Sequence, residues 1–176
     1  TSYYARGGVS GTLYEKGGPP MATVAAFGDS QAGMYLAGGV CAALLHARNT
    51  GRGEKVTVNL MHTAVFALGH MVASARYGGN VYPRSRYETL NPFQAAYQTR
   101  DGRWLQMAMH NYDQAYPLMC ELLGRPDLVD DARYSTFAVV KENPRPFIEI
   151  VDEAMAKRDA ADWLAIFDAQ DLPVAK

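Results

Sequence analysis

Residues 30–49 form the segment that most constrains the fold, because they predict a helix that is apolar around nearly its whole circumference. Small and apolar residues recur at helical spacing along two of its faces, at Ala32, Leu36, Gly39 and Ala43 and at Met34, Gly38, Cys41 and Leu45. A helix without a polar face is normally buried, and small residues let neighbouring backbones approach it closely. Gly51 is predicted to end the helix. We therefore expect a buried helix that other elements surround.

The segments on either side of this helix differ in pattern. Residues 1–27 are rich in glycine and tyrosine and are predicted to be mostly loop and turn. Val56, Val58 and Leu60 alternate with polar residues, which predicts a short strand, and apolar residues return to helical spacing over 65–75. A strand followed by a helix is typical of the α/β class, so the first half of the chain is predicted to be α/β.

A stretch without hydrophobic periodicity separates the two halves of the chain. It covers residues 78–92 and contains a glycine pair and two prolines, which favour turns and connections over regular elements. We therefore divide the sequence into residues 1–80, a connecting arm over 81–90, and a second domain over 91–176.

The second domain is predicted to be α+β. Residues 93–98 and 104–109 flank Asp101-Gly102, and an Asp-Gly pair between two such runs is a strong hairpin signal. Three amphipathic helices are predicted to follow, beginning near Asn111, Asn143 and Asp159.

The composition excludes several classes of function. The chain has 176 residues with Lys+Arg 17 against Asp+Glu 18, so it is nearly neutral and is not expected to bind nucleic acid or a membrane surface. Its longest apolar run, over 33–45, is too short to span a bilayer, which needs about 20 residues. Cys41 and Cys120 are far apart and do not indicate a disulfide framework. These features together predict a cytoplasmic protein.

The residue that most invites a chemical interpretation is Asp29, at the start of the apolar helix. A helix-start aspartate can be a plain N-cap, which accepts an amide hydrogen bond worth about 1 kcal/mol. Alternatively, the helix N-terminus keeps the carboxylate ionised and available as a nucleophile. A carboxylate is a weak nucleophile and needs an activated electrophile, such as a thioester carbonyl.

The surrounding residues resemble the core signature of the class III coenzyme A transferases, the CaiB/BaiF-type family. The matching positions are Gly28-Asp29, Gly33-Met34-Tyr35, Gly39, Ala42-Ala43-Leu44, His46, Arg48, Thr50-Gly51, Gly53, Val56 and Val58. The resemblance continues through 91–104, 130–134 and 160–174. It implies that the chain is the middle part of a longer α/β enzyme, with the first part of a large nucleotide-binding domain before Thr1 and the return of that domain after Lys176.

The resemblance also implies an activity and an assembly. Asp29 would be the nucleophile that forms aspartyl anhydride and aspartyl-CoA intermediates while coenzyme A passes from an acyl-CoA to a carboxylic acid. The coenzyme A thioester is then a substrate, and no bound cofactor or metal is expected. His62 and His70 are eight residues apart on one helix and lack the spacing of a metal-binding pair. Subunits of this family interlock, so a homodimer is implied.

Four further residues are candidates for contact with coenzyme A. Gly7 and Gly8 could form a chain reversal near its tail, and Tyr4 could line the pocket or pack in the core. Arg48 could meet its phosphates or simply complement the negative end of the helix.

Two local features of the sequence predict which class of carboxylic acid the enzyme uses as a substrate. Formyl-CoA transferases carry a glycine-rich loop where this chain reads His110-Asn111-Tyr112-Asp113, which disfavours a formyl or oxalyl substrate. Residues 82–97 and the Gly7-Gly8 opening look more like the branch that acts on 2-hydroxy acids.

Two alternatives stay open at this point. A 2-methylacyl-CoA racemase would use the same aspartate, but it needs a second base for proton exchange, and Ser2-Tyr3 stands where that family has a His-Asp step. The other alternative is a non-catalytic structural fragment in which Asp29 only caps a helix.

Overall fold

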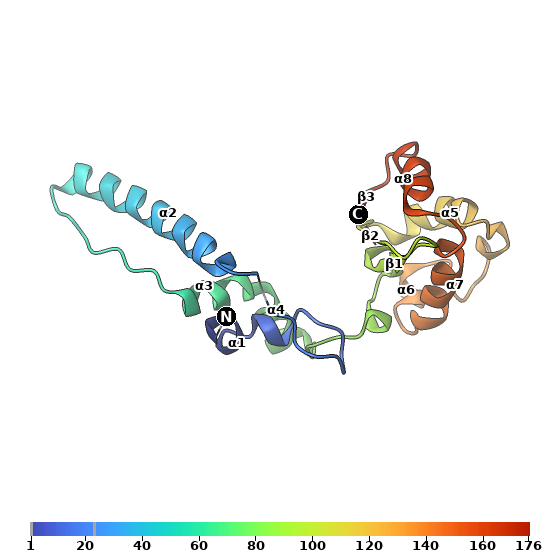
Figure 1. Ribbon diagram of the computed structural model, residues 1–176, viewed down its shortest axis with the longest axis horizontal. Helices are drawn as coiled ribbons and strands as arrows, with labels where there is room; N and C mark the ends of the chain where they lie inside the picture. Colours follow the sequence, from blue (N-terminus) through green and yellow to red (C-terminus); the bar gives the residue numbers. More distant parts are fainter. Residues whose placement is uncertain (1, 23) are drawn as a thin grey trace. The chain divides into compact units, whose positions relative to one another are not determined.

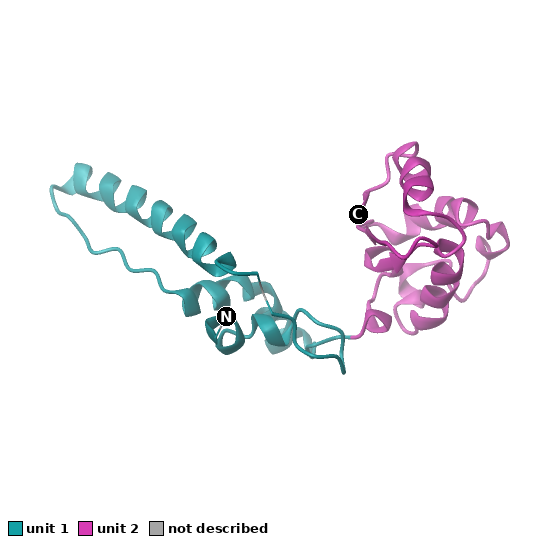
Figure 2. Ribbon diagram, viewed as in Figure 1, with its two compact units in different colours: residues 1–84 teal, residues 85–176 magenta. Residues whose placement is uncertain are grey.

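The computed structural model describes residues 2–22 and 24–176, which belong to two compact units, residues 1–84 and 85–176 (Figure 2). The first unit is helical. Its elements are α1 (Ser2–Arg6), the 3-10 turn η1 (Val9–Gly11), α2 (Phe27–Thr50), α3 (Leu60–Ala67) and α4 (Gly69–Gly78) (Figure 1).

Helix α2 confirms the predicted helix and begins three residues earlier than expected, at Phe27 rather than residue 30. Ala26 precedes it in the left-handed region, with φ 60°. Gly51 ends the helix as predicted, because its φ of 72° suits glycine and its amide donates to the carbonyl of Ala47 at 2.8 Å.

The prediction that this helix is buried is wrong for the chain described here. Along α2, Gly28 alone is buried, whereas Met34 is 76% and Leu45 is 62% exposed. Close packing is confined to one stripe of the helix, where Gly39 lies so near Val56 that a Cβ on the glycine would be 2.8 Å from Cγ1 of the valine. The small residues do allow close approach, but few described elements of this unit are available to cover the other faces.

The strand predicted at 56–60 does not form. Residues 52–59 run without regular hydrogen bonding from α2 to α3, and Leu60 is already helical (Figure 1). A strand requires a neighbour to share its ladder of hydrogen bonds, and the described part of this unit contains no other strand. Asn59 instead caps α3, because its Oδ1 accepts from the amide of His62 at 2.8 Å.

Two other local predictions in the first unit are confirmed in outline. Described residues 2–22 and 24–27 are mostly loop and turn, and they also contain the short helix α1 and the turn η1. The helical pattern over 65–75 is confirmed, although it is divided between α3 and α4, with the break at Leu68.

The second unit contains a three-stranded antiparallel sheet in the order β1-β2-β3. Strands β1 (Ala96–Gln98) and β2 (Trp104–Met107) form the predicted hairpin, with Gly102 at φ 76° in its turn. Strand β3 (Val174–Ala175) pairs with the other edge of β2 and was not predicted.

Helices surround this sheet and supply most of the core of the second unit. They are α5 (Tyr112–Leu122), α6 (Phe137–Val140), α7 (Arg145–Met155) and α8 (Ala160–Asp168), with 3-10 turns η2 (Arg86–Glu88), η3 (Pro92–Gln94) and η4 (Pro126–Leu128). The predicted starts are confirmed within two residues, because α5 follows Asn111, α7 follows Pro144 and α8 follows Asp159. Helix α6 was missed.

The core of the second unit is built around Phe147 of α7, which is fully buried. Its ring lies 5.7 Å from that of Phe93, 5.6 Å from that of Tyr116 and 5.2 Å from that of Tyr134. These separations are typical of interacting aromatic pairs, so α7 holds η3, α5 and the 130–134 turn together.

An ion pair joins η2 to α7 at the edge of this core. Arg86 donates to both carboxylate oxygens of Asp152, at 2.8 and 2.9 Å, and its guanidinium lies over the ring of Tyr97 at 5.4 Å. The two-point geometry fixes the arginine side chain against the sheet.

Candidate active site

Asp29 lies in the first turn of α2 as its third residue, and its side chain is exposed. The N-cap position belongs to Ala26, so the interpretation of Asp29 as the N-cap is wrong. Both the amide and the hydroxyl of Ser30 donate to the carbonyl of Ala26, at 3.0 and 3.1 Å. The structure therefore leaves the Asp29 carboxylate accessible at the positive end of a 24-residue helix, where negative charge is stabilised.

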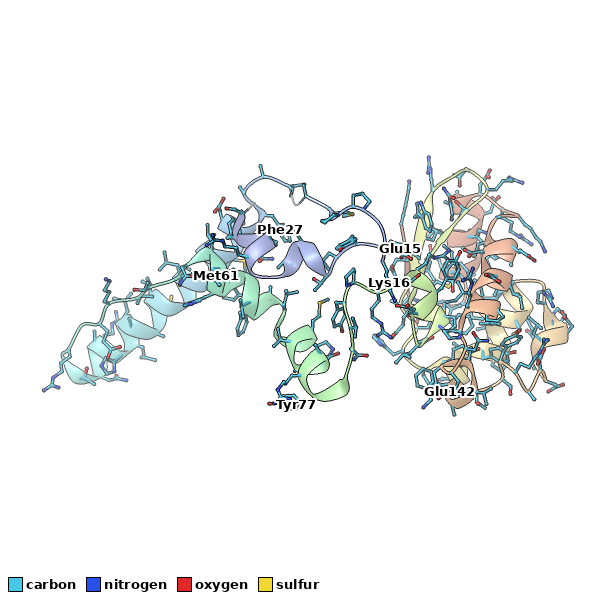
Figure 3. All side chains as sticks on the ribbon, turned by 90° about the horizontal axis from the view of Figure 1, so that it is seen from below. Glu15, Lys16, Phe27, Met61, Tyr77 and Glu142 are labelled. Atoms are coloured by element: carbon cyan, nitrogen blue, oxygen red, sulfur yellow. The ribbon has the colours of Figure 1, made fainter. Side chains whose placement is uncertain are left out.

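Two consecutive tyrosines of α1 pack against this first turn. The ring of Tyr3 lies against the backbone of Gly28, so closely that a Cβ there would be 2.6 Å from Cζ of the tyrosine. Tyr4 is only 1% exposed, and its hydroxyl donates to Oε1 of Gln31 at 3.0 Å. Phe27, labelled in Figure 3, lies at the start of α2. Its ring lies 5.9 Å from that of Tyr4.

Burial raises the pKa of the Tyr4 hydroxyl, and the neighbouring Tyr3 raises it further. Tyr4 therefore stays protonated at neutral pH and acts as a hydrogen-bond donor. The sequence singled out Tyr4 for contact with coenzyme A, and the structure places it in the interior of the first unit. Its partner Gln31 was missed, because no local pattern relates two residues 27 positions apart.

Gly7 and Gly8 form the turn between α1 and η1, where packing and backbone conformation both favour glycine. A Cβ on Gly7 would be 2.5 Å from Cβ of Ala64, so the glycine lets α1 approach α3. Gly8 has a φ of 91°, which side chains rarely tolerate. A turn is present at these two glycines. A chain reversal there, and contact of either glycine with coenzyme A, stay predictions.

Arg48 is not brought near Asp29. It lies in the last turn of α2, and a rise of 1.5 Å per residue places it about 28 Å along the helix axis from Asp29. Its cation complements the negative end of the helix. A contact with a phosphate stays a prediction for Arg48.

Two of the cavities next to α2 adjoin the first half of the helix. An apolar one of about 260 Å³ adjoins the start of the helix and is lined by Val9, Ser10, Leu13, Met21, Ala22, Val24 and Phe27. The other, of about 250 Å³, lies between α2 and α3 and is lined by Tyr35, Thr57, Val58, Asn59, His62, Thr63 and Phe66. Either is large enough for a small apolar or aromatic group.

Within residues 2–22 and 24–176, no cluster of three or more His, Cys, Asp or Glu side chains could hold a metal ion. Cys41 is exposed and Cys120 is buried, and both are free thiols. Among the described helices, none is both long enough and apolar enough to cross a bilayer.

Comparison with known proteins identifies the family. The model of CoA-transferase family III matches residues 1–176. This chain belongs to CoA-transferase family III. The predicted resemblance to this family is thereby confirmed.

Individual relatives agree with the branch that the sequence suggested. The chain is 44% identical over 178 residues to cinnamoyl-CoA:phenyllactate CoA-transferase of Clostridium sporogenes, covering 99% of this chain and 43% of that protein. It is 40% identical over 176 residues to (R)-2-hydroxy-4-methylpentanoate CoA-transferase of Clostridioides difficile, covering 100% of this chain and 44% of that protein. The chain therefore spans less than half the length of these relatives.

The fold is also shared with a solved structure. A CaiB/BaiF family protein from Brucella suis superposes with a TM-score of 0.79 at 22% identity, over 99% of this chain and 46% of that one. At this identity the likeness shows the fold alone.

Proposed function

We propose that the protein containing this chain transfers coenzyme A from an acyl-CoA to a 2-hydroxy acid, with Asp29 as the nucleophile. The observation that carries the proposal is the 44% identity to an enzyme named for phenyllactate, over nearly the whole of this chain. The exposed position of Asp29 in the first turn of α2 supports its role. Within this proposal, residues 1–80 are part of a large domain, 81–90 are an arm, and 91–176 are a small domain.

The first half of the reaction loads coenzyme A onto the aspartate. The Asp29 carboxylate attacks the carbonyl carbon of the donor thioester, the C–S bond breaks, and coenzyme A leaves as a thiolate. This leaves a mixed anhydride between Asp29 and the donor acyl group. The thiolate then attacks the aspartyl carbonyl, the donor acid leaves as a carboxylate, and an aspartyl-CoA thioester remains.

The second half repeats these steps in reverse order with the acceptor. The carboxylate of the 2-hydroxy acid attacks the aspartyl-CoA carbonyl and expels the thiolate, which forms a second anhydride. The thiolate attacks the acceptor carbonyl of this anhydride, releasing the new acyl-CoA and free Asp29. No proton or electron is gained or lost overall.

Helix α2 contributes to these steps through its N-terminus. The first amides of a helix lack intrahelical acceptors, and they favour negative charge nearby. In this proposal they stabilise the ionised Asp29 and the oxyanion that develops as each carbonyl is attacked. The exposed side chain leaves room for a thioester at this end of the helix.

The proposed assembly follows from the family resemblance and from the exposed faces of α2. An interlocked homodimer would bury apolar side chains such as Met34 and Leu45, which are largely exposed here. The mass of the intact protein in solution tests the proposed homodimer. Cell fractionation tests the proposed cytoplasmic location.

The decisive experiment traps the aspartyl intermediate in the intact protein. Hydroxylamine added with cinnamoyl-CoA should convert Asp29 to a hydroxamate, which peptide mass spectrometry locates. Asp29→Asn should abolish both the adduct and coenzyme A transfer to phenyllactate.

Asp162→Asn is the matched control for this trap. Asp162 is an exposed acid at the third position of α8, the same helical position as Asp29 in α2. It should leave transfer within about twofold of wild type, since surface changes away from a site have small effects. Full activity of Asp29→Asn would overturn the mechanism, and exchange of an α-proton with solvent without transfer would indicate a racemase.

A further inference from the structure

We infer that Tyr3 and Tyr4 are positioning residues for the Asp29 carboxylate, acting through their contacts with the first turn of α2. The inference rests on the proposed function, in which Asp29 is the nucleophile. It assigns no chemical step to the tyrosines themselves. The two side chains contact α2 at Gly28 and Gln31, which lie one residue before Asp29 and two residues after it.

The contact of Tyr3 is steric. Gly28 alone is buried among the residues of α2, and it is the tyrosine ring that covers it. A Cβ at this position would lie 2.5 Å from Cε2 and 2.6 Å from Cζ of Tyr3, well inside ordinary contact. Glycine therefore allows the ring to rest directly on the helix backbone beside Asp29.

The contact of Tyr4 is directional. Its hydroxyl donates to Oε1 of Gln31 at 3.0 Å from a side chain that is 1% exposed. The hydrogen bond fixes the rotation of the helix turn that carries Gln31. The tyrosine ring also lies 5.9 Å from that of Phe27, so Tyr4 contacts α2 both before and after Asp29.

The tyrosines are themselves held by the rest of the first unit. Tyr4 belongs to a small buried cluster with Val9, Ala64 and Leu68, which joins α1 to α3. The carbonyl of Tyr3 accepts from the amide of Gly7 at 2.7 Å. The first turn of α2 is thus braced through α1 against α3.

Bracing of this kind matters because a positioned nucleophile tolerates little displacement. The backbone of an α-helical turn is rigid. Contacts at Gly28 and Gln31 therefore set the position of Asp29 along the helix axis and the direction in which its side chain leaves the helix. A misplacement of about 1 Å can cost on the order of a hundredfold in rate. The tyrosines therefore influence the rate of attack through the position of Asp29.

The test uses the intact protein and removes single interactions. Tyr4→Phe deletes only the hydroxyl and is expected to lower kcat at least about tenfold, with KM for cinnamoyl-CoA within about twofold of wild type. Gln31→Met removes the acceptor from a half-buried helix position and is expected to have the same effect. The double variant is expected to lose no more than either single variant, because both act through one hydrogen bond.

Tyr112→Phe is the matched control. Tyr112 is 2% exposed and donates to the carbonyl of Tyr134 at 2.7 Å in the core of the second unit, so this variant also removes the hydrogen bond of a tyrosine hydroxyl on a buried side chain. It should leave kcat within about twofold of wild type. Thermal unfolding of all variants confirms that each is folded at the assay temperature.

Three outcomes would overturn the inference. Tyr4→Phe with kcat near wild type would show that the hydrogen bond does not position Asp29. An equal fall in kcat for Tyr4→Phe and Tyr112→Phe would indicate general destabilisation. If Asp29→Asn were active, the proposed function would fail as well, whereas an inactive Asp29→Asn beside a normal Tyr4→Phe would remove the positioning role alone.

Discussion

Replacement of Phe147 by alanine should show how much the second unit depends on its aromatic core. The side chain is fully buried, and four aromatic rings surround it, those of Phe93, Tyr112, Tyr116 and Tyr134. Loss of a buried phenylalanine typically lowers the free energy of unfolding by about 3–5 kcal/mol, part of which reflects the cavity left behind.

The structure places Phe147→Ala toward the upper part of this range. Aromatic pairs contribute about 0.5–1.5 kcal/mol beyond the area they bury, and here several pairs are lost together. We expect the free energy of unfolding to fall by about 4–5 kcal/mol, a large share of the roughly 5–15 kcal/mol available to a domain. Phe147→Leu keeps an apolar side chain and is expected to lose less, so it serves if the alanine variant does not fold.

The assay is urea unfolding of the 176-residue chain followed by tryptophan fluorescence. Both tryptophans of the sequence, Trp104 and Trp163, lie in the second unit, so their emission reports on that unit. Glu149→Ala on the same helix is the control. It removes an exposed ion pair with Arg145 worth about 0.3–0.5 kcal/mol. A loss below about 1.5 kcal/mol for Phe147→Ala would refute the reasoning, since such a value is typical of conservative core changes.

Two further predictions concern the exposed helix and an acidic turn. In the monomeric chain, the backbone amides of residues 30–49 in α2 should exchange hydrogen at least about a hundredfold faster than those of α5. The reason is that a helix with little tertiary packing is marginally stable. Equal protection of the two helices would contradict this. Hydrogen bonds from Arg133 hold the pKa of Asp131 at about 2, below its ordinary value. The stabilisation by Asp131 should therefore be complete above about pH 4 and disappear as the pH falls to 2. The test is the difference between the urea midpoints of wild type and Asp131→Asn, which should shrink as the pH falls. A difference at pH 2 equal to that above about pH 4 would contradict the prediction.

Local interactions explain the features that the sequence predicted correctly. The end of α2 at Gly51, the hairpin around Asp101-Gly102 and the start of α5 after Asn111 each depend on residues within a few positions of one another. Backbone conformation at a turn or cap is set by those neighbouring residues, so the amino-acid sequence contains the information needed to predict it. The same holds for the buried face of α7, whose period of 3.6 residues needs no knowledge of what covers it.

Tertiary structure decided the features for which a distant partner is required. The alternation of residues 56–60 suits a strand, yet the described unit provides no neighbour to share its hydrogen bonds, and the segment stays unpaired backbone. Strand β3 exists only because it meets β2, with Ala175 opposite Gln106. The apolar pattern of α2 likewise indicates that the helix can be buried. It does not indicate which element would bury it.

The candidate site divides in the same way. The position of Asp29 at the start of an apolar helix could be predicted from the sequence, because helix boundaries follow from local pattern. Its contacts through Gly28 and Gln31 to the tyrosines of α1 could not. Residues 27 positions apart meet only after α1 and α2 pack together, and no local rule specifies which side chains then come within hydrogen-bonding distance.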